Sequence, residues 1–218
     1  HLGTCLSSVE ILACLYWSEL RVDPAKPNDP YRDRFTLSKG HAAPLLFQVL
    51  AEKGFFSVNH LLETYGSDGS FFHEHPTIPI FTPGIEAATG SLGHGLPMAL
   101  GMAISSLITN HSYRCYSLLG DGECNEGTIW EAAMVATAQN VSNLTAIVDF
   151  NKWQATCRTE DTMSTQMLVD KWRAFGWHVI DIDGHDLSNI LDSFVQAKSN
   201  TYQPTAIIAH TIKGKGID

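Results

Sequence analysis

The feature that most constrains the fold is a regular alternation of short apolar runs and longer helix-like segments. The runs at 113–119, 144–150 and 205–210 are apolar along most of their length, rather than at every second position. Strands with this pattern are buried on both faces, which is typical of a parallel sheet between two layers of helices. The sequence therefore predicts an α/β fold with a doubly wound, mostly parallel sheet and helices on both faces.

Periodic apolar positions and capping residues place the expected elements along the 218 residues. Helices are predicted at 7–20, 43–52, 59–65, 95–108, 126–139, 165–175 and 186–198. Strands are predicted at 35–38, 113–119, 144–150, 178–182 and 205–210. Residues 66–89 are rich in Gly, Pro and His with little periodicity, which indicates a long functional loop. No internal boundary is visible, so 1–218 is expected to be a single domain.

Charge and cysteine usage exclude several classes of function. The net charge is −9 without a basic cluster, so we expect no binding to nucleic acid or to a membrane. The five cysteines are odd in number and form no CxxC pair, which is typical of a reduced, cytoplasmic protein without zinc or disulfides. No apolar run is long enough to span a bilayer.

Two predicted strands end in oxygen-bearing side chains that suit a metal ion. Asp121 lies between two glycines after the strand that ends at Leu119, and Asn151 follows the strand that ends at Phe150. If these strands are neighbours, both side chains converge beyond their carboxyl ends, where open parallel sheets bind ligands. Oxygen ligands without His or Cys favour Mg²⁺ or Ca²⁺. The glycines allow a diphosphate to approach the backbone closely. A helix from about Glu126 would point its N-terminus toward that diphosphate.

Neither half of this pair is specific alone, because a Gly-Asp-Gly turn and an Asn after a strand are both common. Their separation of thirty residues, with one helix between two strands, favours the metal site. This spacing resembles that of thiamine diphosphate enzymes, and GDGECNEGTIWEA at 120–132 is similar to the transketolase form. Other transketolase-like stretches follow in the family's order: HLGTCLSSVEIL at 1–12, LSKGHAAP at 37–44, HEHP at 73–76, TGSLGHGLPMALGMA at 89–103, AFGWHVIDIDGHD at 174–186 and HTIKGKG at 210–216.

The resemblance covers the family's first domain and implies its diphosphate-binding fold, with the pyrimidine and C-terminal domains absent from this chain. It implies thiamine diphosphate as the cofactor, with Mg²⁺ or Ca²⁺ held by Asp121, Asn151 and the backbone carbonyl of Trp153. The cofactor-binding residues that it implies are Thr4, Lys39, His41, Gly90, Ser91, Leu92, Gly120, Asp121, Gly122, Asn151 and Lys213. The catalytic residues that it implies are His1, His41 and His75, since histidine moves protons near neutral pH. Glu126 matches an acid at the family's subunit interface.

The implied activity is transfer of a two-carbon ketol unit from a ketose phosphate to an aldose phosphate. Because the family's second domain supplies the glutamate that activates the cofactor, we expect this chain to be inactive alone. It is expected to be the N-terminal subunit of a split transketolase, with a truncated full-length enzyme as the alternative. The expected partner is a C-terminal subunit with the pyrimidine domain, in a heterotetramer or dimer of heterodimers.

Two departures from the family pattern keep other functions open. His94 replaces the usual Gln near the thiamine rings, and Thr77 replaces an acid that often follows HP. These changes allow an unusual sugar, either modified or branched, as the substrate. A non-catalytic binding or regulatory subunit is disfavoured by the intact Asp121, Asn151 and His41. A deoxyxylulose phosphate synthase and a nucleotide-binding domain are disfavoured by their missing motifs.

Overall fold

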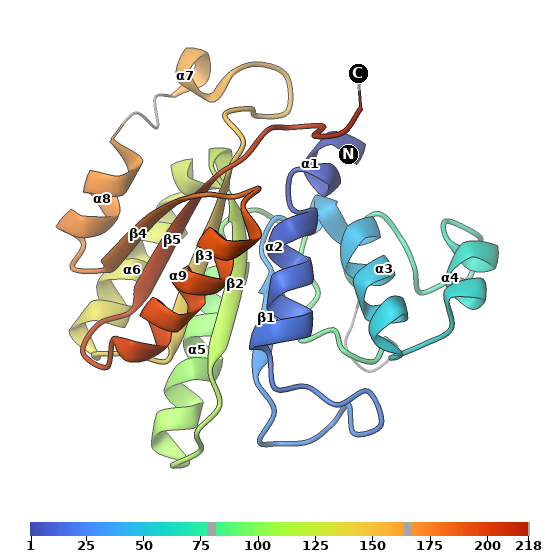
Figure 1. The fold of residues 1–218 in the computed structure, drawn as a ribbon, viewed down its shortest axis with the longest axis horizontal. Helices are drawn as coiled ribbons and strands as arrows, with labels where there is room; N and C mark the ends of the chain where they lie inside the picture. Colours follow the sequence, from blue (N-terminus) through green and yellow to red (C-terminus); the bar gives the residue numbers. More distant parts are fainter. Residues whose placement is uncertain (78–81, 164–166, 218) are drawn as a thin grey trace.

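The computed structural model describes residues 1–77, 82–163 and 167–217. Within them lies a five-stranded, entirely parallel sheet in the order β1-β2-β3-β5-β4 (Figure 1). The strands are β1 (Arg34–Leu37), β2 (Cys115–Gly120), β3 (Leu144–Phe150), β4 (His178–Asp183) and β5 (Thr205–His210). The predicted parallel α/β fold is confirmed.

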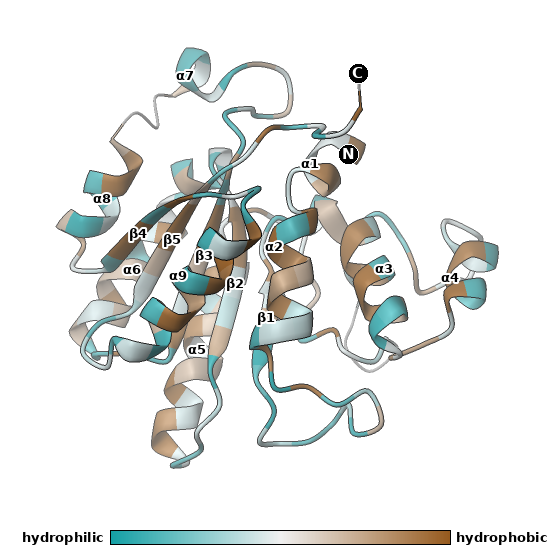
Figure 2. Ribbon diagram, in the orientation of Figure 1, coloured by the Kyte–Doolittle hydropathy of each residue, from teal (hydrophilic) through white to brown (hydrophobic). Residues whose placement is uncertain are grey.

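Helices cover both faces of this sheet because successive strand residues point in opposite directions. Leu118 and Ile147 belong to one buried cluster, whereas their neighbours Leu119 and Val148 belong to a second one. Helices α2 (Val9–Cys14), α3 (Ala43–Lys53) and α9 (Leu187–Ser199) pack in the first cluster (Figure 1). Helices α5 (Gly95–Ile108), α6 (Gly127–Ala138) and α8 (Leu168–Ala174) pack in the second. In Figure 2 helix α5 is mostly brown, while the loop that leads into β1 is mostly teal.

The α-helices are α1 (Leu2–Leu6), α2 (Val9–Cys14), α3 (Ala43–Lys53), α4 (Val58–Thr64), α5 (Gly95–Ile108), α6 (Gly127–Ala138), α7 (Thr159–Thr162), α8 (Leu168–Ala174) and α9 (Leu187–Ser199). A π-helical turn (Leu15–Glu19) continues α2, and two 3₁₀ turns occupy Gly40–Ala42 and Gly122–Asn125. No helix in the described ranges is long and apolar enough to cross a bilayer.

The first predicted helix, 7–20, is wrong at its start. The chain forms a separate helix α1 before it, and α2 begins only at Val9. The hydroxyls of Ser7 and Ser8 both donate to the carbonyl of Thr4, and such local bonds compete with a continuous helix. The short α7 has too few residues for a periodic signal. Of the other expectations, parts of the loop 66–89 and of the helix 165–175 lie outside the described residues.

The carboxyl edge of the sheet collects the segments singled out in the sequence. Strands β2 and β3 are neighbours, with Gly120 opposite Asp149. The residues after β5 reach the start of the chain, where Gly214 donates its backbone N–H to the carbonyl of Gly3 at 2.9 Å. Figure 1 accordingly places both chain ends and α1 near this edge.

Candidate cofactor and metal site

The loop after β2 lies directly against the loop after β3. Asp121 accepts a hydrogen bond from the backbone N–H of Lys152 at 2.9 Å and one from the hydroxyl of Thr159 at 3.0 Å. Lys152 has a positive φ of 68°, which turns the chain back toward Asp121. The two loop tips that the sequence predicted to converge are therefore side by side.

Asn151 is oriented by two hydrogen bonds within its own loop. Its Nδ2 donates to Oδ2 of Asp149 at 2.8 Å, and its Oδ1 accepts from the backbone N–H of Trp153 at 3.1 Å. Both Asn151 and Asp121 are buried, with 6% and 1% of their surfaces exposed. The amide oxygen thus lies on the side of Trp153, whose carbonyl is the third predicted ligand.

These groups fit a hard divalent cation. Burial, with a smaller contribution from the charge of Asp149, raises the pKa of Asp121 to about 6, against hydrogen bonds that lower it. A bound cation would offset this cost of burying a carboxylate. Mg²⁺ takes one or two protein oxygens and completes its shell with phosphate and water. Among the described residues, no group of three His, Cys, Asp or Glu side chains is placed so that it could hold a metal ion.

Close backbone contacts hold the turn at 90–93 against its neighbours. A Cβ on Gly40 would lie 2.8 Å from the backbone nitrogen of Gly90. Gly93 has a φ of +87°, and a Cβ there would lie 2.4 Å from Oγ1 of Thr128 in α6. The predicted cofactor turn is therefore packed between the end of β1 and the start of α6, with Ser91 exposed and Leu92 half-buried.

The three predicted catalytic histidines come together from distant segments. The ring of His1 lies 5.2 Å from that of His41 and 6.4 Å from that of His75, centroid to centroid. Thr4 lies beside them, with Oγ1 at 3.4 Å from Nε2 of His41. His1 and His41 line a pocket of about 440 Å³ with Leu45 and other mainly apolar residues. The arrangement suits proton transfer to a polar substrate, and the catalytic roles stay predictions.

His41 is held in its neutral form at physiological pH. Burial lowers the pKa of its imidazole to about 4, and the positive charges of Lys39, His75 and Lys213 act in the same direction. A neutral imidazole can donate a hydrogen bond from one ring nitrogen and accept at the other. This form suits a group that orients a hydroxyl.

The stability of the cofactor-free chain is expected to depend on pH through His41. Because its folded-state pKa lies below the ordinary 6.5, the unfolded chain binds more protons between pH 4 and 6.5. The His41 contribution to stability therefore falls as the pH falls through that window. Urea unfolding of wild-type and His41→Gln chains at pH 7 and pH 5 measures it. The wild-type chain should lose more stability than the variant, and equal losses would contradict a lowered pKa.

Lys39 lies inside the protein rather than at a surface that faces phosphate. Its side chain is completely buried, and its ammonium forms an ion pair with Asp149. The ammonium also donates to the carbonyl of Thr4 at 3.1 Å and to the hydroxyl of Ser8 at 3.0 Å. In this structure the ammonium is therefore engaged, and its predicted contact with the cofactor stays a prediction.

Sequence reasoning missed Asp149, whose carboxylate connects several segments at the carboxyl edge of the sheet. Burial by itself would raise the pKa of its carboxyl, but Lys39 and hydrogen bonds from Thr211 and Ser7 hold the pKa below its ordinary value. Asn151 also donates to this carboxylate. The only signal in the sequence was one acid within the mostly apolar run LTAIVDF.

Two further charged residues, Lys213 predicted at the cofactor and Glu126 predicted at a subunit interface, lie in different places. Lys213 donates to the carbonyl of Gln154 at 2.9 Å, and its ammonium lies 5.8 Å from the ring of Trp153. It therefore lies at the predicted metal loop. Glu126 occupies the N-cap position of α6 without a side-chain capping bond, and it is exposed.

Glu123, in the turn that follows Asp121, is buried rather than solvated. Its carboxylate is 2% exposed and accepts hydrogen bonds from Ser38, Gly93 and Gly120. Burial raises the pKa of this carboxyl, and the three hydrogen bonds oppose that shift. The side chain points inward because three donors there replace the water that it loses.

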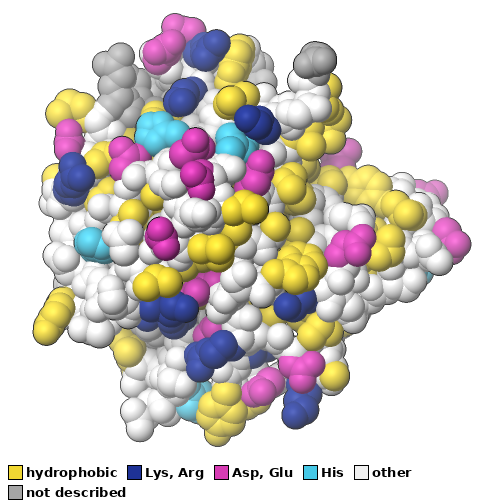
Figure 3. All heavy atoms as spheres, in the orientation of Figure 1, with side chains coloured by type: hydrophobic (Ala, Val, Ile, Leu, Met, Phe, Trp, Pro, Cys, Tyr) yellow, Lys and Arg dark blue, Asp and Glu magenta, His cyan; other side chains and the backbone are white. Residues whose placement is uncertain are grey.

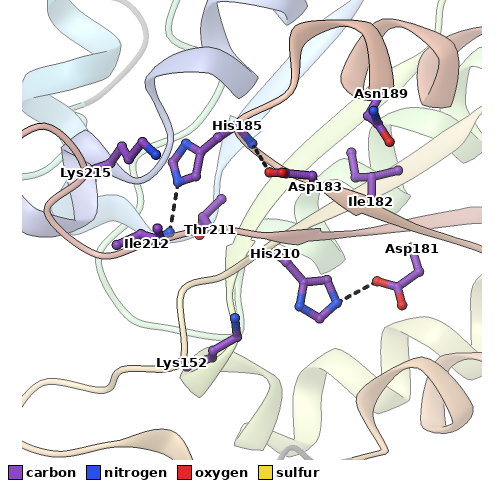
Figure 4. A pocket seen from close by; sticks show the side chains of 10 residues that line it. All are labelled: Lys152, Asp181, Ile182, Asp183, His185, Asn189, His210, Thr211, Ile212 and Lys215. Atoms are coloured by element: carbon purple, nitrogen blue, oxygen red, sulfur yellow. Dashed lines mark hydrogen bonds and ion pairs between the residues drawn. The ribbon is translucent and has the colours of Figure 1, made fainter.

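A second hollow, of about 470 Å³, lies beyond the ends of β4 and β5 (Figure 4). Its wall contains a His210–Asp181 pair at 2.7 Å and His185, whose Nε2 accepts from the backbone N–H of Ile212 at 2.9 Å. Figure 3 shows histidine and acidic side chains gathered over this part of the surface. His185 thus anchors the segment that carries Lys213.

The fold and the paired loops define an α/β domain of the thiamine diphosphate-binding class. The family model described as "Transketolase, thiamine diphosphate binding domain" matches residues 1–218. The chain therefore belongs to the transketolase family. It is a transketolase-type transferase subunit with a thiamine diphosphate-binding domain.

Relatives of two kinds match the chain. It is 42% identical to an apulose-4-phosphate transketolase subunit of Phocaeicola vulgatus, over 100% of this chain and 76% of that protein. It is 44% identical to the 6-deoxy-6-sulfo-D-fructose transketolase subunit SqwG of a Clostridium species, over 99% and 78%. It is 43% identical to human transketolase over 100% of this chain, but spans only 34% of that protein.

Solved structures agree with this assignment. The transketolase of Leishmania mexicana superposes with a TM-score of 0.89 at 26% identity, over 99% of this chain and 37% of that one. The transketolase of Campylobacter jejuni gives a TM-score of 0.89 at 28% identity, over 99% and 38%. The chain therefore spans little more than a third of these solved transketolase chains.

Proposed function

We propose that the chain is the N-terminal subunit of a thiamine diphosphate-dependent transketolase. It would take part in moving a two-carbon ketol unit from a ketose phosphate to an aldose phosphate. The observation that carries the proposal is the hydrogen bond from the Lys152 backbone to Asp121, which brings the two predicted metal loops together. The match of the family model along the whole chain supports it.

The metal ion of this proposal is Mg²⁺, with Ca²⁺ as an alternative, bound by Asp121, Asn151 and the carbonyl of Trp153. The glycine-rich turn after β2 and the ammonium of Lys213 would meet the diphosphate. The bound cofactor supplies an electron sink for breaking the carbon–carbon bond of the ketose. The protein supplies orientation, exclusion of water and proton movement.

His1, His41 and His75 are the proton-moving groups of this proposal. Neutral His41 would accept or donate a hydrogen bond at a sugar hydroxyl, assisted by its two neighbouring imidazoles. A charged imidazole would be less useful as a base, because it has no free lone pair. Thr4 and the apolar wall of the pocket would restrict the ring of His41 to one orientation.

The proposed partner is a C-terminal subunit that carries the pyrimidine domain. Two relatives matched by nearly the whole chain are named as subunits, which supports an enzyme divided between two chains. We infer that residues 1–218 form the diphosphate-binding domain and that two such pairs assemble into a heterotetramer. Glu126 would lie at that interface. The cytoplasm is the proposed location, given free cysteines throughout the described chain.

A second candidate differs only in the sugar. The relatives just mentioned are named for apulose 4-phosphate and for 6-deoxy-6-sulfo-D-fructose, neither of which is a common pentose phosphate. His94 is exposed at the start of α5, two residues beyond the predicted cofactor turn. The activity assay should therefore include an unusual ketose as donor beside the common phosphorylated sugars of the pentose phosphate pathway.

Reconstitution tests the proposal directly. The chain, a candidate C-terminal subunit, thiamine diphosphate and Mg²⁺ should together transfer a ketol unit from xylulose 5-phosphate to ribose 5-phosphate or another aldose. A turnover on the order of 10 s⁻¹ is expected with the right sugar, and none when either chain is omitted. Coupled detection of the aldose product measures it. A complex that binds the cofactor but turns over no ketose, common or modified, would favour a non-catalytic subunit.

A further inference from the structure

The Glu123 carboxylate joins three separate segments at the carboxyl edge of the sheet. Its Oε1 accepts from the hydroxyl of Ser38 at 2.5 Å and from the backbone N–H of Gly93 at 2.8 Å. Its Oε2 accepts from the backbone N–H of Gly120 at 3.1 Å. No other donor is needed to explain its burial, because both oxygens are satisfied by these three groups.

Each of the three donors is next to residues that the proposed function places at the cofactor. Ser38 directly precedes Lys39, Gly40 and His41. Gly93 directly follows the turn at 90–92, and Gly120 directly precedes Asp121. Glu123 itself follows the Asp121–Gly122 pair in the same 3₁₀ turn. One carboxylate thus connects the turn at 90–93, the segment from Ser38 to His41 and the metal loop at Asp121.

The packing around this carboxylate leaves little room for adjustment. A Cβ on Gly95 would lie 2.5 Å from Cα of Ser38, and one on Gly93 would lie 2.8 Å from Cβ of Glu126. Backbones in such close contact move together when one of them is displaced. A change in the hydrogen bonds of Glu123 is therefore transmitted to the cofactor turn rather than absorbed locally.

We propose that Glu123 is a positioning residue for the cofactor, a role that rests on the proposed function. It does not contact the cofactor. It fixes the distance between the turn at 90–93 and the metal loop at Asp121, so that the ring end and the diphosphate end of one molecule are held at the same time. Removing its charge would loosen that distance and weaken binding of the whole cofactor.

The Glu123→Gln variant of the two-subunit complex tests this role. The variant keeps the size of the side chain, but its –NH₂ must face at least one N–H or O–H donor. The dissociation constant for thiamine diphosphate at saturating Mg²⁺ is expected to rise about 10- to 100-fold, the range typical of residues that orient a site. Isothermal titration measures it. In kinetics the cofactor concentration needed for half-maximal rate should rise, while kcat at saturating cofactor stays near wild type.

Asp33 offers a matched control at the opposite edge of the sheet. It is also 2% exposed, and it accepts backbone N–H bonds from Arg21 at 2.9 Å and Arg114 at 2.8 Å. Asp33→Asn should lower the melting temperature of the complex without changing the dissociation constant for the cofactor. An unchanged constant in Glu123→Gln, or an equal rise in Asp33→Asn, would overturn the proposal.

The Ser38→Ala variant keeps the test decisive if Glu123→Gln does not fold. It removes one of the three donors and leaves the carboxylate in place, so a rise of a few-fold in the cofactor dissociation constant is expected. No rise in Ser38→Ala would count against Glu123. Failure of the unaltered complex to bind thiamine diphosphate would instead contradict the proposed function itself, which separates the two conclusions.

Discussion

The Asp121→Asn variant is expected to lose Mg²⁺-dependent binding of thiamine diphosphate by about 100-fold or more, beyond the effect typical of residues that only orient a ligand. Asparagine keeps the shape of the side chain but removes the charge that attracts the cation. Titration of the assembled complex with the cofactor, with and without Mg²⁺, measures the loss. Unchanged affinity would rule out Asp121 as a metal ligand.

The stability of the same variant separates a lost ligand from a damaged fold. Because burial raises the pKa of Asp121 to about 6, ionising this carboxyl costs stability as the pH rises from about 4 to about 6. Without metal or cofactor, raising the pH from about 4 to about 6 should therefore lower the unfolding temperature of wild type more than that of Asp121→Asn, which has no carboxyl to ionise at this position. Asp161→Asn, which changes an exposed acid in α7, should alter neither quantity.

The largest expected effect on stability comes from Lys39→Met. This change leaves the Asp149 carboxylate buried without its ion-pair partner, which typically costs about 3–5 kcal/mol. The melting temperature of a chain of this size should fall on the order of 10 °C. Calorimetry or urea unfolding at pH 7 measures the change.

Two comparisons sharpen that result. Lys39→Met with Asp149→Asn should recover much of the loss, because the buried charge is gone while an acceptor oxygen remains. Lys198→Met removes a more exposed ion pair with Glu19 and should cost about 1 kcal/mol or less. Since Lys39 keeps the pKa of Asp149 below its ordinary value, the pair stabilises the fold above about pH 4 and loses this effect as the pH falls further. A loss equal to that of Lys198→Met would contradict a buried ion pair.

The repeated pattern of the sequence was sufficient for the fold and for the meeting of the two loops. Apolar runs at the positions of β2, β3 and β5, alternating with longer helical segments, are typical of a sheet buried on both faces. Once the strands before Asp121 and Asn151 are parallel neighbours, their following loops must lie at one edge. These conclusions depend on the periodicity of the apolar residues and on the order of the predicted elements, both of which a single sequence displays.

Directions of individual polar side chains could not be predicted in this way. The partner of Lys39 is Asp149, 110 residues later, and nothing near either residue indicates the other. Glu123 has the sequence context of an exposed acid at a helix start, yet its donors come from segments brought together only by the completed sheet. The break between α1 and α2 lies at Ser7 and Ser8, whose hydroxyls lie within hydrogen-bond distance of the Thr4 carbonyl, while that of Ser7 also reaches Asp149, 142 residues later.

The strand order has a consequence for how the chain reaches this structure. Arg34 in β1 pairs with Cys115 in β2, so 81 residues separate the two partners. Forming this pair requires closing a large loop, and the entropy of loop closure is lost before the strands gain any stabilising contact. This order of events slows folding. During synthesis, β1 leaves the ribosome long before β2 has been made. Until then, the apolar residues of β1 have no neighbouring strand to pair with. A chaperone that shields this first strand would therefore improve the yield of the protein more than one acting on the later, locally connected β4 and β5.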